Sequence, residues 1–103
     1  MLFNEKINPV YVNGLIALVE ACAENSVKIT EIHNHMNGFI VLFDVEGGDA
    51  ILHDGSYGRS IGEWETMGFP WDGMDVSVHD ADTLARLLAA VKNGEDWQEI
   101  EGE

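Results

Sequence analysis

Hydrophobic residues first recur at helical spacing between residues 9 and 24. Asn8-Pro9 supplies an N-cap and a first helical residue. The residues that then return to one face are Tyr11, Leu15, Leu18 and Cys22, with Val19 beside them. The pattern predicts an amphipathic helix over about 9–24, in which Cys22 is a small core residue.

An alternating pattern follows this helix and predicts a hairpin. Residues 27–36 and 39–45 are rich in strand-forming residues and flank Asn37-Gly38. This residue pair favours a type I′ turn, because both central positions of that turn need a positive φ.

A turn centred on Asn37-Gly38 fixes the expected register of the two strands. The face expected to pack on the helix pairs Met36 with Phe39, Asn34 with Val41, and Ile32 with Phe43. The opposite face is expected to pair His35 with Ile40, His33 with Leu42, and Glu31 with Asp44.

The rest of the chain predicts further strands and a second helix. Turn residues at 46–49 lead to a strand over 50–53, residues 61–65 allow a short strand, and residues 74–78 alternate like one. Asp80 or Asp82 then caps a helix. Its buried stripe is Leu84, Leu87, Leu88 and Val91, and it ends at Asn93-Gly94. We therefore expect a small α+β domain: an N-terminal helix, an antiparallel sheet of three to five strands, a C-terminal helix and an acidic tail over 95–103.

Length and composition are consistent with one domain spanning 1–103. The chain has 103 residues, of which 46% are hydrophobic, enough for one modest core. A single cysteine excludes an internal disulfide and suits a reducing compartment. No run of 18 apolar residues occurs, and the first residues lack the pattern of a signal peptide. We expect a cytoplasmic protein.

The net charge is the strongest functional signal. Nineteen acidic residues oppose five lysines and arginines, giving −14 at pH 7. Residues 44–103 hold fifteen of the acids. Such a field attracts cationic partners and repels nucleic acid and anionic membranes, and it exceeds the magnitude of about 2–8 that keeps a small domain soluble. The partner is therefore expected to be a cationic protein.

Catalytic signals are weak. His33 and His35 project to one face of a strand and can share a metal, with Glu31 and Asp44 on the same expected face. Their His-Asn-His resembles the His-x-His of the JAMM metalloproteases, but Phe43 and Glu46 stand where that family needs Ser and Asp. Ser56 lacks a nucleophile elbow and is interpreted as a turn residue. No cofactor motif is present, and we expect no enzymatic activity.

An aromatic and acidic stretch lies between the predicted sheet and the second helix. Its apolar members are Trp64, Met67, Phe69, Pro70, Trp71 and Met74, and its acids are Glu63, Glu65, Asp72 and Asp75. The aromatic residues either fold back over the core or serve as exposed anchors for a partner. In the second case, apolar anchors and carboxylates together suit a basic protein.

Carboxylates can replace nucleic acid in such a complex. A carboxylate presents two acceptor oxygens to an arginine, as phosphate does and as guanine O6 and N7 do. A rigid array of Asp and Glu can therefore occupy a nucleic-acid-binding cleft.

In layout and charge, the chain resembles the small acidic phage-encoded anti-CRISPR proteins, in particular inhibitors that occupy the PAM-reading surface of Cas9. The matching segments are 15–24, the strands around Asn37-Gly38 and around 46–49, and the closing helix with its exit at 91–94 into Asp96-Trp97. The resemblance implies a helix, three antiparallel strands and a helical C-terminus. It also implies a bacterial host cell and occlusion of a PAM site or DNA channel.

The sequence thus predicts a non-enzymatic inhibitor, an anti-CRISPR being the leading case. Its expected partner-binding residues are Asp44, Glu46, Asp49, Glu63, Glu65, Trp71, Asp72, Asp75, Asp96, Trp97 and Glu99. An immunity or anti-restriction protein against a basic nuclease is the nearest alternative. A metal-dependent hydrolase using His33 and His35, and a structural or regulatory protein that its acidity merely solvates, are alternatives of other classes.

Overall fold

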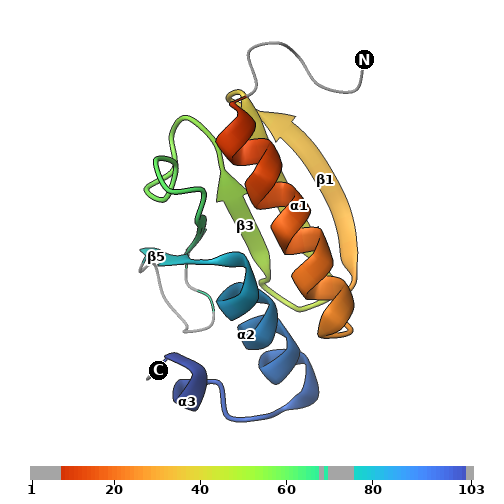
Figure 1. Cartoon of the computed structure of the whole chain (residues 1–103). Helices are drawn as coiled ribbons and strands as arrows, with labels where there is room; N and C mark the ends of the chain where they lie inside the picture. Colours follow the sequence, from red (N-terminus) through yellow and green to blue (C-terminus); the bar gives the residue numbers. More distant parts are fainter. Residues whose placement is uncertain (1–7, 68, 70–75, 102–103) are drawn as a thin grey trace.

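The chain forms an α+β domain, as predicted. The computed structural model describes residues 8–67, 69 and 76–101. The helices are α1 (Pro9–Glu24), α2 (Ala81–Asn93) and α3 (Gln98–Glu101). The strands are β1 (Ile29–His35), β2 (Gly38–Phe43), β3 (Asp49–Leu52), β4 (Trp64–Met67) and β5 (Val76–His79). They form one antiparallel sheet in the order β1-β2-β3-β4-β5, and α1 and α2 lie on one face of it (Figure 1).

The helix termini follow the capping residues in the sequence. The Asn8 side chain accepts a hydrogen bond from the Val10 amide at 2.9 Å, which caps α1. Asp80, rather than Asp82, caps α2, because its Oδ1 accepts from the Thr83 amide at 2.7 Å. Gly94 ends α2 in the left-handed conformation, with φ 71°.

The core lies between the two helices and the sheet. Its largest fully buried side chains are Leu18 of α1, Phe39 and Val41 of β2, Leu52 of β3, Trp64 of β4, and Leu84, Leu87 and Leu88 of α2. The Trp64 indole N–H donates to the Gly14 carbonyl oxygen at 3.2 Å and so joins β4 to α1. The predicted helical stripes are confirmed except at Val19, which is 44% exposed, and at Val91, which packs against the core but is only partly buried.

The register predicted for the hairpin is wrong, because the turn lies one residue earlier in the chain than predicted. The observed pairs include His35–Gly38, Asn34–Phe39 and Ile32–Val41, so the two turn residues are Met36 and Asn37. Both adopt positive φ, 46° and 63°. The pairing of Glu31 with Asp44 is also wrong, because Glu31 lies opposite Leu42. The faces predicted for the histidines are confirmed: Glu31, His33 and His35 point away from the helices, whereas a register shift before Glu31 turns Ile29 toward the core.

Gly38 explains the shift, because it is needed in the strand rather than in the turn. A Cβ at this position would lie 2.1 Å from the Leu52 carbonyl oxygen and 2.6 Å from the His53 Cα.

Asp54, just after β3, also holds the turn: its Oδ2 accepts from the Asn37 side chain at 2.8 Å and its Oδ1 from the Tyr11 hydroxyl at 2.9 Å. These hydrogen bonds, Asn37 first, lower the pKa of the Asp54 carboxyl below its usual value.

Substituting Gly38 with alanine should destabilise the protein by roughly 3 kcal/mol, since overpacking against a backbone that cannot yield lies at the upper end of such costs. Gly47→Ala is the matched control, because Gly47 has φ 73° but no atom lies within 4 Å of the position that a Cβ would take there. That variant should lose only about 1–2 kcal/mol, the cost of a left-handed residue. Urea unfolding measures both; equal losses would show that Gly38 has no packing role.

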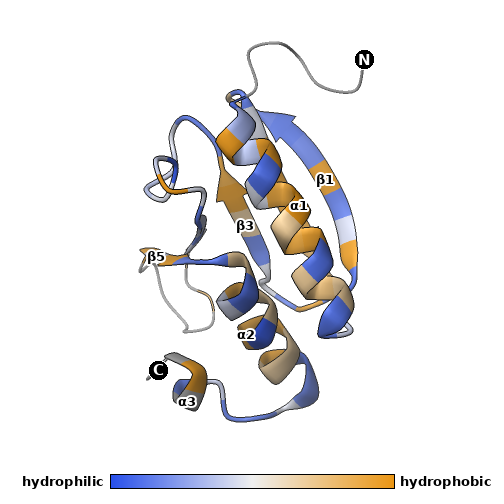
Figure 2. Ribbon diagram, in the orientation of Figure 1, coloured by the Kyte–Doolittle hydropathy of each residue, from blue (hydrophilic) through white to orange (hydrophobic). Residues whose placement is uncertain are grey.

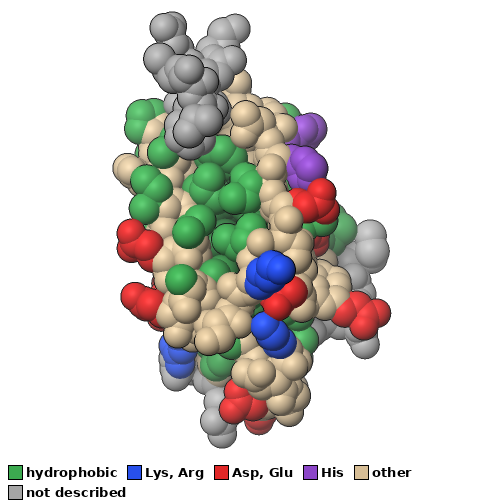
Figure 3. Space-filling model, turned by 90° about the vertical axis from the view of Figure 1, so that its right-hand side faces the viewer, with side chains coloured by type: hydrophobic (Ala, Val, Ile, Leu, Met, Phe, Trp, Pro, Cys, Tyr) green, Lys and Arg blue, Asp and Glu red, His purple; other side chains and the backbone are tan. Residues whose placement is uncertain are grey.

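The helix-side face of β1 is left uncovered. The expectation that Ile32 and Met36 pack on the N-terminal helix is wrong: they are 45% and 50% exposed. Ile16 of α1 is also exposed. Figure 3 shows an apolar area on the side of the molecule formed by α1 and β1. Two helices are too few to cover five strands, and α1 packs against β2 and α2. Accordingly, Figure 2 shows β1 as mainly hydrophilic.

Candidate protein-interaction surface

The sheet face that points away from the helices carries the residues of greatest functional interest. Directly paired residues lie on the same side of a sheet, so the register identifies this face. One row of it crosses all five strands: His33, Ile40, Ile51, Glu65 and Val78. We call this side the open face.

A second row on the open face adds two carboxylates and more apolar surface. It runs from Glu31 through Leu42 to Asp49, and Met67 pairs with Val76 farther along. The partly or well exposed apolar side chains of the two rows are Ile40, Leu42, Ile51, Met67, Val76 and Val78. None of these strand positions holds a lysine or arginine. The open face therefore combines apolar area with Glu31, Asp49 and Glu65 and has no balancing cation on its described strands.

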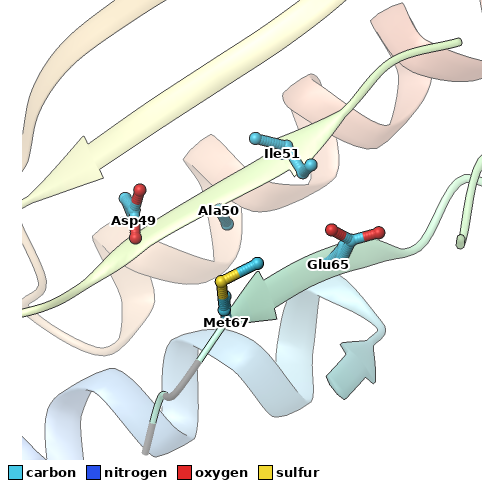
Figure 4. A pocket seen from close by; sticks show the side chains of 5 residues that line it. All are labelled: Asp49, Ala50, Ile51, Glu65 and Met67. Carbon is cyan, nitrogen blue, oxygen red and sulfur yellow. The ribbon is translucent and has the colours of Figure 1, made fainter. Parts of the chain in front are cut away.

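A shallow pocket lies on this face between β3 and β4. Its volume is about 200 Å³, and its lining is Asp49, Ala50, Ile51, Glu65 and Met67. Only Ile51 and Glu65 are paired between these two strands, so the strands separate toward Asp49 and Met67. Figure 4 shows Asp49, Glu65 and Met67 around the space between them.

Glu65 is a buried carboxylate. It is only 8% exposed, and its Oε1 accepts a hydrogen bond from the Tyr57 amide at 2.8 Å. This bond tethers the loop between β3 and β4. Glu65 lies inside β4, so the short strand that the sequence allows over 61–65 is observed over Trp64–Met67. Glu63, just before that strand, is half-buried.

Three of the four histidines, His33, His35 and His53, lie near one end of the open face, whereas His79 pairs with the core residue Trp64. His33 Nε2 lies 3.3 Å from Glu31 Oε1, and both side chains are more than half exposed. The rings of His35 and His53 meet edge-on with centroids 5.2 Å apart. Burial, and then the proximity of His35, lower the pKa of His53 below its usual value.

The described residues around His33 and His35 do not form a set of metal ligands. Within the described residues, no group of three or more His, Cys, Asp or Glu side chains is placed to hold a metal ion. Asp44, expected beside His33, instead forms an ion pair with Lys92 at 2.7 Å.

Asp44 is expected to contact a partner, but in the structure its carboxylate makes contacts with other residues of the same chain. Besides the Lys92 ion pair, its Oδ1 accepts from the Lys28 amide at 3.0 Å. The hydrogen bond from Lys92 is the main reason that the pKa of Asp44 lies below its usual value. Of its predicted neighbours, Glu46 is exposed in the turn between β2 and β3, and Asp49 reaches the open face.

The other expected contact residues divide into two sets. Trp71, Asp72 and Asp75 lie outside the described residues. Asp96 and Trp97 lie beyond α2, in the helical layer. Asp96 is exposed and accepts from the Gln98 amide at 2.9 Å, and Trp97 packs partly buried against the core. The side chain of Glu99 is also outside the description. The structure therefore does not unite Asp96 with Asp49 and Glu65.

The two potential nucleophiles are structural. Burial, with a smaller effect of Asp44, raises the pKa of the Cys22 thiol to about 11, so the thiol stays protonated at neutral pH. The Ser56 hydroxyl donates to the His53 carbonyl oxygen at 2.9 Å and accepts from the His53 amide at 3.1 Å. It closes a turn, as predicted from the sequence.

Sequence reasoning missed Glu31 as a member of the acidic surface. The sequence places Glu31 near the histidines, and its relation to Asp49 becomes visible only when three strands are paired. The signal was present in the alternation of β1, β2 and β3, which places Glu31, Leu42 and Asp49 in one row.

Comparisons of the chain with protein-family models, with curated proteins and with solved structures found no match in any of the three sets. Among the residues that the structure describes, no helix has both the length and the apolar character needed to cross a lipid bilayer.

Proposed function

We propose that this protein is a non-enzymatic inhibitor that binds a cationic nucleic-acid-binding protein of a bacterial defence system through the open face. A CRISPR-Cas effector is the leading target. The observation that supports this proposal is the row of carboxylates on an apolar sheet face that has no lysine or arginine on its described strands, in a chain of net charge −14.

The open face combines the two features that a mimic of nucleic acid needs. Glu31 and Asp49 come from different strands of one sheet, so their spacing is held by backbone hydrogen bonds rather than by a flexible loop. Their oxygens can accept hydrogen bonds from arginines that otherwise bind phosphate. The apolar side chains between them supply the desolvated contact area that a charged surface alone lacks.

The remaining acidic residues have a different role in this proposal. Exposed charges outside the contact accelerate the encounter with a cationic partner, and salt screens them over about 10 Å at 0.1 M. The association rate should therefore fall steeply as salt rises, whereas the dissociation rate should change little.

The test is an order-of-addition gel shift with a panel of targets: a Cas9 loaded with guide RNA, a type I surveillance complex, and a basic restriction nuclease. Protein added before the target DNA should prevent the shift of the DNA, and protein added afterwards should act far more weakly. Inhibition of the nuclease alone would identify an anti-restriction or immunity protein. A normal DNA shift with every target, at saturating protein, would contradict occlusion.

A further inference from the structure

We propose that the pocket between β3 and β4 receives one arginine side chain of the partner protein, with Glu65 at its base and Asp49 at its rim. This inference rests on the proposed function, because it names the group on the partner that the open face recognises. It is nevertheless a property of this chain alone and can be tested without the partner.

The main observation is a buried carboxylate that is only half satisfied. Glu65 is 8% exposed, and its Oε1 accepts from the Tyr57 amide. Its Oε2 accepts no hydrogen bond from a described residue, although Glu65 lines an open pocket. Burying a carboxylate without enough donors is unfavourable, so an incoming donor with a positive charge would complete it.

No described lysine or arginine forms an ion pair with Glu65. His53 interacts electrostatically with this carboxylate, but burial lowers the pKa of the imidazole below its usual value and so disfavours its charged form. Lys92 is paired with Asp44 at 2.7 Å, and Arg59 Nη1 donates to the Ser56 carbonyl oxygen at 2.9 Å. Neither Asp49 nor Glu65 forms an ion pair with any described lysine or arginine. A permanently charged partner for Glu65 would therefore come from outside the described part of the chain.

The pocket lining favours arginine over lysine. Ile51 and Met67 provide apolar walls for the methylene groups of the side chain, and the two carboxylates provide acceptors on two strands. A guanidinium is weakly hydrated and carries five donors in a fixed plane, so donors remain for a second acceptor when one is bonded to Glu65, whereas an ammonium is compact and strongly hydrated. The volume of about 200 Å³ leaves room for one side-chain head group and part of its stem.

The test is an NMR titration of the full chain with N-acetylarginine methylamide. The matched probes are the citrulline derivative, which has the same stem without the charge, and the lysine derivative. We expect saturable amide shifts confined to 49–51 and 65–67 with the arginine probe, at least tenfold weaker binding of the lysine probe, and no response to citrulline.

Variants locate the binding. Glu65→Gln should weaken the arginine probe at least tenfold, while a glutamine Oε1 still accepts from the Tyr57 amide and so preserves the loop. Glu46→Gln is the control, because it removes the same charge from the exposed turn beside β3. Shifts that do not saturate, equal binding of lysine, or equal loss in both variants would overturn the proposal.

The result is separable from the proposed function. If the arginine probe binds this pocket and no target of the panel is inhibited, the pocket stands and the proposed function fails. If a target is inhibited equally well by the native protein and by Glu65→Gln, and the probe does not bind, the pocket proposal fails and the proposed function stands.

Discussion

Replacing Glu31 and Asp49 together by lysine should abolish binding to the target while the fold survives. The two residues flank Leu42 in one row of the open face, so the double variant places two positive charges where the proposed interface needs two negative ones. Removing one member of a desolvated charge pair typically costs about 2–5 kcal/mol, and reversal adds repulsion. Affinity should therefore fall by more than about 100-fold, since each 1.4 kcal/mol is a factor of ten.

The matched control is Glu20→Lys with Glu24→Lys. Both residues are exposed on α1, in the layer that covers the other face of the sheet, and the change in net charge is identical. The control should slow association slightly through weaker steering and leave dissociation unchanged. Surface plasmon resonance at two salt concentrations separates the rates, and urea unfolding checks both folds. Similar losses in the two double variants would mean that only overall charge matters and that the open face is not the interface.

Local signals in the sequence predicted the helices well because their causes are local. Asn8-Pro9, Asp80 and Gly94 act on their own helix ends, and the leucine spacing of α2 corresponds directly to its buried stripe. Gly14 lies in the middle of α1, although glycine disfavours helices. The structure gives its reason: a Cβ there would lie 2.4 Å from Leu52 Cδ2, so α1 needs a glycine to approach β3.

The errors arose where tertiary contacts decide. The pair Asn37-Gly38 is compatible with two arrangements: both residues in the turn, or Asn37 in the turn and Gly38 in the strand. Only the proximity of Gly38 to β3 distinguishes them. Ile32 and Met36 alternate like buried residues, but Ile32 lies on the edge strand β1 and Met36 in the turn that follows it, and both are about half exposed. Nothing in the sequence distinguishes Glu65 from the other acidic residues, because its burial depends on the pairing of β4 with β3 and on the hydrogen bond from the Tyr57 amide.

The residues of the aromatic stretch are expected either to fold back over the core or to be exposed anchors, and Trp64 is a core residue. Its side chain is fully buried, and its indole bonds to the Gly14 carbonyl oxygen of α1. Phe69 is also buried, whereas Met67 is 53% exposed on the open face. One strand thus contributes a core anchor and a surface residue within four positions, which the alternation of a strand explains.

Trp64→Ala should accordingly destabilise the protein by about 3–5 kcal/mol, the range for deleting a buried large aromatic residue. That is a large share of a typical total of about 5–15 kcal/mol. Met67→Ala, on the same strand, should change stability by less than about 0.5 kcal/mol, as exposed substitutions do, yet it should weaken target binding by removing a wall of the pocket. Urea unfolding and target binding are measured for both variants. If Trp64 belongs to the core and Met67 to the interface, Trp64→Ala has the larger effect on stability, and Met67→Ala weakens target binding without a comparable loss of stability. A stable Trp64→Ala variant that binds its target poorly would instead make Trp64 a partner anchor and would contradict the packing described for it.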